Sequence, residues 1–190
     1  EGDGGLVVEL TDGAFYGYRG QLFYDLCKLS TIRLAYAMSV ELEGHPITAV
    51  AVTPGFLRSE AVLDHFGVTE DNWRDAIAQD PHFAHSETPL LVGRVIAALA
   101  ADPAVASRAG RVLSCWELAR HYGITDVDGA QPHWDEHLDA AIERILAGES
   151  ASPDDLLLLR IRKPQLDFDD SRAVQRARIE RFLRSHESAE

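Results

Sequence analysis

The sequence predicts an α/β protein with a parallel sheet, and two observations carry this prediction. Residues 6–10 and 47–52 are short apolar runs typical of buried strands, and a long segment of helical periodicity lies between them. A crossover of that length lets the two strands pair in parallel. A second helix-to-strand step, between residues 88 and 115, adds a third strand. With 190 residues, 46% of them hydrophobic, the chain can bury one core.

The first half of the chain is expected to hold a strand, a helix and a second strand. The strand at residues 6–10 ends in a Thr-Asp-Gly turn. Apolar side chains then recur with helical spacing from residue 21 to residue 43, where a Gly-His-Pro sequence stops the pattern. This segment is predicted to be a long, largely buried helix. The following strand, at residues 47–52, ends in a Thr-Pro-Gly sequence.

The second half is expected to continue with a polar insertion and further core elements. Residues 60–87 are polar and rich in His, Asp and aromatic side chains, with a helix expected at 70–79. That composition is more typical of a lid over a substrate than of a core layer. A helix at 88–101 and a strand at 110–115 then return to the core.

Composition divides the chain into two parts. Residues 1–147 are expected to form the domain that holds the sheet, with residues 60–87 as its substrate-binding segment and a last helix at 132–147. Residues 148–190 are expected to form a helical C-terminal extension, with a highly charged helix at 171–184.

Charge and composition exclude several classes of function. The formal net charge is −13, so a nucleic acid or an anionic membrane surface would be repelled. The longest apolar run, near residues 90–101, contains Gly93 and Arg94 and is too short to span a bilayer. Two cysteines are too few for a disulfide framework and fit a reducing compartment. We therefore expect a cytoplasmic protein that binds neither nucleic acid nor membrane.

Tyr24 and Lys28 form the candidate catalytic pair. Their spacing of four residues places both side chains on one face of the predicted helix, about one turn apart. A nearby ammonium group favours the phenolate and lowers the pKa of a tyrosine from its usual value near 10, which suits a general acid or base. A tyrosine and a lysine at this spacing are also common on ordinary helix surfaces, so the pair has to be judged with its surroundings.

Those surroundings resemble the catalytic core of the short-chain dehydrogenase/reductase family. The family has a strand that ends in a catalytic serine, Tyr-x-x-x-Lys thirteen residues later, and a second strand that ends in Pro-Gly with a hydroxyl residue four positions beyond the glycine. Here Thr11 lies thirteen residues before the tyrosine, and Pro54-Gly55 is followed by Ser59. The resemblance covers residues 6–59.

The resemblance implies a catalytic role for three residues. Tyr24 would donate a proton to a carbonyl oxygen, or remove one from an alcohol. Lys28 would bind the ribose next to the nicotinamide and lower the Tyr24 pKa. Thr11 would hydrogen-bond the substrate oxygen and hold it within reach of Tyr24. Tyr24 and Lys28 are thus also expected among the residues that bind the cofactor.

The turn after the second strand is implied to bind the cofactor. Its residues are Pro54, Gly55, Phe56, Leu57 and Ser59. The Pro-Gly backbone would approach the nicotinamide, and the Ser59 hydroxyl would bond the carboxamide or a phosphate. The cofactor would be NAD or NADP, and the choice is open because the sequence contains neither a Gly-rich phosphate-binding turn nor a residue that selects for the 2′ position of the ribose.

The resemblance therefore implies the C-terminal part of a doubly wound, Rossmann-type parallel sheet, with the N-terminal cofactor-binding half absent from this chain. That half, in the same or another chain, would be required for activity. Thr11 stands where the family usually has serine, and its methyl group stiffens the side chain and crowds the site. Ser59 stands where threonine is usual.

A metal site and a reactive cysteine are weaker candidates. His133 and His137 have a helical spacing that suits zinc, with His82 and His85 as further ligands. An exposed amphipathic helix explains the pair better, and we expect no metal. Cys27 is predicted to be a small buried hydrophobe rather than a nucleophile.

The predicted function is an NAD(P)-dependent oxidoreductase that acts on a small-molecule carbonyl or alcohol substrate, with Tyr24 as general acid/base. The aromatic residues Phe66, Trp73 and Phe83 either line the substrate cleft or anchor a lid, and we favour the cleft. The family commonly forms homo-oligomers, which the resemblance implies here too. The alternative is a non-catalytic assembly or binding module without a cofactor.

Overall fold

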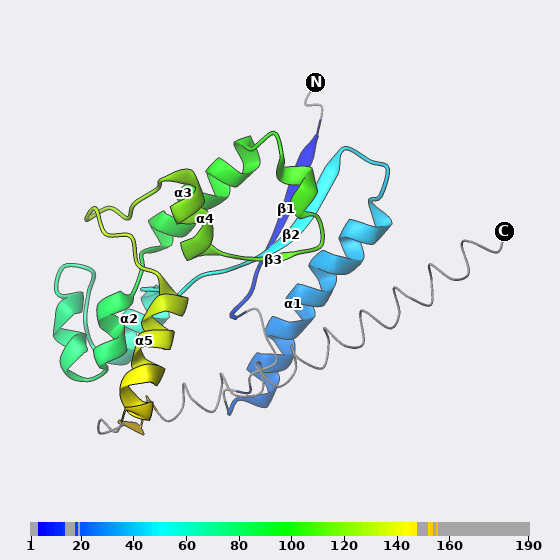
Figure 1. The fold of residues 1–190 in the computed structure, drawn as a ribbon. Helices are drawn as coiled ribbons and strands as arrows, with labels where there is room; N and C mark the ends of the chain where they lie inside the picture. Colours follow the sequence, from blue (N-terminus) through cyan, green and yellow to red (C-terminus); the bar gives the residue numbers. More distant parts are fainter. Residues whose placement is uncertain (1–3, 14–17, 19, 148–151, 154, 156–190) are drawn as a thin grey trace.

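The computed structural model describes most of the chain. The described residues are 4–13, 18, 20–147, 152, 153 and 155 (Figure 1). The charged helix predicted at 171–184 lies outside them. Within the described residues, no helix combines the length and the apolar character that a membrane span requires.

A three-stranded parallel sheet forms the centre of the fold, with strand order β1-β2-β3 (Figure 1). The strands are β1 (Gly5–Leu10), β2 (Ile47–Thr53) and β3 (Val112–Ser114). Leu10 pairs with Val52, so β1 and β2 end side by side. The predicted α/β class and the parallel pairing of the first two strands are confirmed.

One face of the sheet is covered by α1 (Leu22–Glu41), which packs against β1 and β2 (Figure 1). Asp25 and Ala35 are its buried residues, whereas Phe23 is 81% exposed. The prediction of a largely buried helix is wrong for the described part of the chain, because one side of α1 faces the sheet and no described element covers the other. Cys27, on the same helix, is exposed rather than buried.

The opposite face carries α3 (Pro89–Ala101) and α4 (Cys115–Tyr122) (Figure 1). The main hydrophobic core lies between these helices and the sheet, and its buried members include Val50, Val52, Leu91, Val95, Leu99 and Leu118. Thr88 begins α3 as its N-cap, and Gly123 ends α4 with a positive φ of 66°. Helices therefore cover both faces of the parallel sheet, as they do in doubly wound folds.

Residues 60–87 fold beyond the carboxyl end of β2 (Figure 1). They form α2 (Glu60–Phe66) and two 3-10 turns, Trp73–Ala78 and Pro81–His85, in place of the helix predicted at 70–79. Trp73 and Phe83 are buried in a second hydrophobic cluster, which Phe56 of the turn after β2 also joins. The interpretation that these two aromatic residues line a cleft is therefore wrong, because their burial anchors the segment to the strand end.

The last described helix, α5 (Trp134–Leu146), contacts the 3-10 turn Pro81–His85 and lies within the range predicted for it. Trp134 meets Phe56 edge to face, with ring centres 5.7 Å apart. His133 is the N-cap of α5, and its side chain accepts a hydrogen bond from the Glu136 N–H. The helix thus closes one side of the cluster that surrounds the end of β2.

Candidate active site

The residues that follow β1 are joined by hydrogen bonds to the carboxyl end of β2. The Thr11 N–H donates to the Val52 carbonyl at 3.0 Å, and the Gly13 N–H donates to the Thr53 hydroxyl at 2.7 Å. Gly13 has a φ of 79°, a conformation that favours glycine. Thr11 and the Pro-Gly turn therefore lie at neighbouring strand ends, where open parallel sheets bind ligands.

Tyr24 and Lys28 lie together on α1, with the Lys28 ammonium 5.6 Å from the centre of the Tyr24 ring. Tyr24 is 41% exposed, and its hydroxyl donates to the Asp12 carboxylate at 2.8 Å. An ammonium group favours the phenolate, whereas an accepting carboxylate favours the protonated phenol. Asp12 is the second residue after the end of β1. Sequence analysis missed this residue as a contact of the candidate catalytic hydroxyl.

Thr11 is buried, with 2% of its surface exposed, and its hydroxyl donates to the backbone carbonyl of Lys28 at 2.9 Å. This bond ties the end of β1 to the helical turn that carries the catalytic pair. In this structure the Thr11 hydroxyl positions Lys28, and its contact with a substrate oxygen stays a prediction.

Three of the predicted cofactor-binding residues have contacts within the protein. Phe56 packs against Phe83, with ring centres 5.0 Å apart. Leu57 packs against the main core, and Ser59 caps α2 by accepting from the Val62 N–H at 3.4 Å. A role for these three residues in cofactor binding stays a prediction.

Glu87 lies against Gly55, which is half-buried like its neighbour Pro54. Its carboxyl group packs against the Gly55 backbone, so that a Cβ built on Gly55 would come within 3.1 Å of the carboxylate oxygen Oε2. Burial raises the pKa of Glu87 to about 7, although hydrogen bonds from Cys115 and Gly55 lower it. Burial and the neighbouring carboxylate of Glu87 likewise raise the pKa of the Cys115 thiol.

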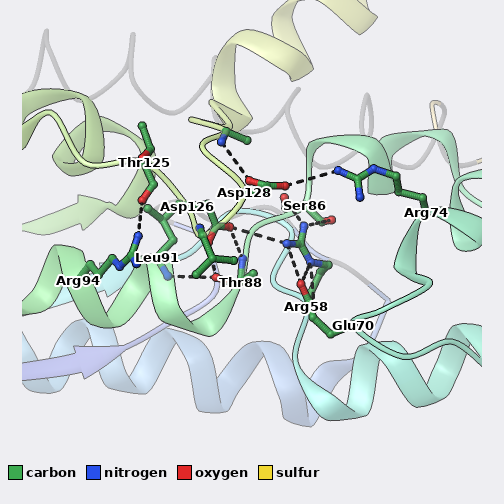
Figure 2. A network of polar contacts seen from close by, with 12 residues as sticks. Arg58, Glu70, Arg74, Ser86, Thr88, Leu91, Arg94, Thr125, Asp126 and Asp128 are labelled. Carbon is green, nitrogen blue, oxygen red and sulfur yellow. Dashed lines mark hydrogen bonds and ion pairs between the residues drawn. The ribbon is translucent and has the colours of Figure 1, made fainter.

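Figure 2 shows a polar network around Arg58, which sequence analysis also missed. Arg58 is 3% exposed, and its guanidinium lies 3.0 Å from the Glu70 carboxylate, 2.9 Å from the Ser86 carbonyl and 3.8 Å from the Asp126 carboxylate. The guanidinium also lies 4.2 Å from the centre of the Trp73 ring. One side chain therefore links the turn after β2 to the 60–87 segment and to the loop after α4.

The buried Asp126 has further donors of its own. It accepts from the backbone N–H of Thr88 at 2.8 Å, from the Thr88 hydroxyl, and from the Val127 N–H at 2.7 Å. Because Thr88 is the N-cap of α3, Asp126 connects the start of that helix with Arg58 (Figure 2).

The histidines considered as zinc ligands divide between two places. Nδ1 of His82 lies 2.9 Å from Nε2 of His137, and the rings of His85 and His137 are stacked. His133 instead contacts the Glu117 carboxylate at 2.9 Å. Burial, with the charges of His85 and His82, lowers the pKa of His137 to about 4. In the part of the chain that the structure describes, no group of three or more His, Cys, Asp or Glu residues is arranged to hold a metal ion.

Comparison with known proteins found similar sequences and no matching family model. The human (Homo sapiens) protein named "Dehydrogenase/reductase SDR family member 1" is 32% identical over 132 residues, and its mouse (Mus musculus) counterpart is 32% identical over 127 residues. Each alignment covers 66% of this chain and 40% of the relative, so the chain spans less than half the length of these proteins. A solved structure, a variant of the actinorhodin polyketide ketoreductase with NADPH, is 22% identical with a TM-score of 0.46, over 59% of this chain and 46% of that one.

Proposed function

Since this chain belongs to the short-chain dehydrogenase/reductase family over the part that it shares with its relatives, we propose that it carries the catalytic residues of an NAD(P)-dependent oxidoreductase. The reaction would interconvert a carbonyl and an alcohol. The supporting observation is the position of Tyr24 and Lys28 on one helix, beside the neighbouring ends of β1 and β2. A dinucleotide-binding half, in the same or another chain, would complete the site.

The described residues fit the nicotinamide end of such a cofactor. Tyr24 is exposed, Lys28 is half-buried beside it, and the Pro-Gly backbone ends the adjoining strand. Lys28 would bind the ribose hydroxyls, and Pro54 and Gly55 would lie against the nicotinamide. When bound in its reduced form, the cofactor supplies the hydride that a carbonyl carbon accepts.

Tyr24 would move the proton that accompanies this hydride. In the reductive direction its hydroxyl proton passes to the carbonyl oxygen and leaves a phenolate, which the Lys28 ammonium stabilises. In the oxidative direction the phenolate takes a proton from the alcohol. Because the Tyr24 hydroxyl donates to Asp12 in this structure, a bound substrate oxygen would have to replace that acceptor.

The proposed function is tested by following hydride transfer in the intact protein. A reduced cofactor that carries deuterium at both positions of C4 of the nicotinamide is incubated with a panel of ketones and aldehydes. We expect deuterium on the carbinol carbon of the alcohol product. If turnover leaves no deuterium there, or if no nicotinamide-dependent turnover is found, the proposed function is wrong.

Lys28→Ala is expected to lower turnover and to weaken cofactor binding together. It removes the charge that favours the phenolate and a contact to the ribose, so the alkaline limb of a Tyr24-dependent pH profile should also move upward. Steady-state kinetics over a range of pH measure all three effects. Arg33→Ala is the matched control, because it removes an exposed cation from the same helix. Equal effects of the two substitutions would argue against a role for Lys28.

Substitutions of Thr11 separate its hydroxyl from its volume. Thr11→Ala is expected to lower kcat by about 10²–10³-fold if a hydrogen bond to the reacting oxygen is lost. Thr11→Ser keeps the hydroxyl and relieves crowding, so its activity should equal or exceed that of the parent protein. Thr11→Val keeps the volume without the hydroxyl and should resemble the alanine variant. High activity of the valine variant would show that the hydroxyl has no part in the reaction.

A non-catalytic assembly module is the second candidate function, and the apolar side of α1 favours it. The exposed apolar residues of this helix include Leu22, Phe23, Leu26 and Leu34. Such a surface is typical of a contact with another protein, and the proposed enzyme would use it to form a homo-oligomer. Both cysteines are free, which fits the cytoplasmic location that we also propose.

A further inference from the structure

Glu87 is attached to the turn after β2 by its backbone. Its N–H donates to the Phe56 carbonyl at 2.9 Å, and its own carbonyl accepts from the Arg58 N–H at 2.8 Å. Leu57 and Glu87 thereby form an isolated parallel bridge. Almost any residue could make these backbone bonds, so they do not explain why position 87 holds a carboxylic acid.

A carboxyl group is costly at this place. The residue is 1% exposed, and one of its oxygens, Oε1, has no hydrogen-bond partner among the described residues. Burying a charged group without full pairing lowers stability, and an apolar side chain of similar size is often more stable at such a position. An incompletely satisfied buried acid therefore calls for a functional explanation.

The groups around Glu87 direct its other oxygen to the Pro-Gly turn. Arg58 offers a positive charge that lowers the pKa of Glu87, and Asp126 a negative charge that raises it. The Cys115 thiol and the Gly55 N–H also lower the pKa of Glu87, and its Oε2 lies 3.1 Å from a Cβ built on Gly55. Because burial outweighs these contributions and brings the pKa to about 7, both protonation states of Glu87 are populated near neutral pH.

We propose that Glu87 is a positioning residue of the oxidoreductase site, whose carboxyl group holds the Gly55 N–H from inside the protein and so fixes the backbone on which the nicotinamide would lie. This inference rests on the proposed function, because the turn can position a cofactor only if one binds. The ionised form accepts the Gly55 hydrogen bond more strongly than the protonated form. Deprotonation should therefore order the turn and improve cofactor binding.

The same deprotonation should lower the stability of the fold. The pKa of Glu87 is higher in the folded protein, about 7, than its ordinary value of 4.5, so the folded state binds the proton more tightly. Stability from this group is complete below about pH 4.5 and is lost as the pH rises through about 7. Glu87→Gln, which cannot ionise, should lack this loss.

The experiment compares Glu87→Ala and Glu87→Gln with a control, Glu60→Gln, which alters an exposed glutamate at the start of α2. In the intact protein without ligand, hydrogen exchange measures protection of the peptide 53–57.

Glu87→Ala should raise exchange at Gly55 by about tenfold, the factor expected for one lost hydrogen bond. It should raise the KM for the nicotinamide cofactor by a similar factor, about tenfold, with a smaller effect on kcat. Glu87→Gln keeps an acceptor oxygen, so it should change both the exchange rate and the cofactor KM less than Glu87→Ala does. For the parent protein we expect the cofactor KM to fall between about pH 6 and pH 8, and Glu87→Gln should abolish this fall.

Three outcomes would overturn the inference, and they are distinguishable. Unchanged exchange at Gly55 in Glu87→Ala would show that the carboxyl group does not hold the turn. Raised exchange with an unchanged cofactor KM would leave Glu87 a purely structural residue. The absence of nicotinamide-dependent turnover in the unaltered protein would refute the proposed function, and the positioning role with it. This third outcome is distinct because it is measured on the unaltered protein alone.

Discussion

Tyr24→Phe is expected to lower the turnover of the intact protein by about 10²–10⁴-fold, the contribution typical of a general acid. The substitution removes the hydroxyl that would transfer the proton and keeps the aromatic ring. Tyr24 is partly exposed, and its hydroxyl bonds the half-buried Asp12, so stability should change by no more than about 1 kcal/mol. Steady-state kinetics and thermal unfolding measure the two effects separately.

Tyr36→Phe is the matched control for this prediction. Tyr36 lies on the same helix, is 48% exposed, and carries the Arg33 guanidinium 5.0 Å from its ring centre. Its hydroxyl has no part in the proposed reaction, so the variant should keep near-full activity. If Tyr24→Phe is equally active toward a confirmed substrate, Tyr24 is a structural residue and the assembly module becomes the better interpretation.

Arg58→Leu is expected to lower the free energy of unfolding by about 3 kcal/mol or more, because it removes a buried cation from two carboxylates. Asp126 is 2% exposed in its side chain and would stay buried with only its N–H and hydroxyl donors. The contact with the Trp73 ring and the bond to the Ser86 carbonyl would also be lost. Denaturant unfolding of the intact protein, followed through tryptophan fluorescence, measures the change.

Two further variants separate the buried part of this network from its exposed part. The Glu70 side chain is 47% exposed, so Glu70→Gln should cost less than about 1 kcal/mol, as solvent-exposed ion pairs usually do. Arg58→Lys keeps the charge but not the planar, forked guanidinium group. Its loss of unfolding free energy should therefore lie between the losses in Glu70→Gln and Arg58→Leu. If Arg58→Leu is as stable as Glu70→Gln or more stable, Arg58 does not hold the 60–87 segment in place.

Short-range spacing was sufficient to predict the strand–helix–strand unit, and the resemblance to a known family then implied its candidate catalytic residues. Thr11 ends a strand, and Tyr24 and Lys28 follow at fixed positions of the next helix, so backbone geometry leaves little freedom in where they lie. The short helix α2 was missed although its boundary residues carried a signal. Ser59 is its N-cap and Gly67 ends it with a φ of 67°, an arrangement that N-cap and C-cap preferences favour.

The contacts around the strand ends could not be predicted in the same way. Arg58 meets Asp126, and Glu87 meets Gly55, across segments far apart in the chain, and neither pair has a local pattern. The exposed side of α1 was mispredicted for a related reason, since apolar periodicity identifies a face but not the element that covers it.

The α/β class, the parallel pairing of β1 with β2 and the shared face of Tyr24 and Lys28 follow from the amino-acid sequence, because apolar periodicity and four-residue spacing act within single elements. The raised pKa of Glu87, the buried charge of Arg58 and the use of the Thr11 hydroxyl depend on the folded arrangement. The reason is that desolvation and hydrogen-bond pairing are set by whichever groups the fold brings within a few ångströms, wherever they occur along the chain.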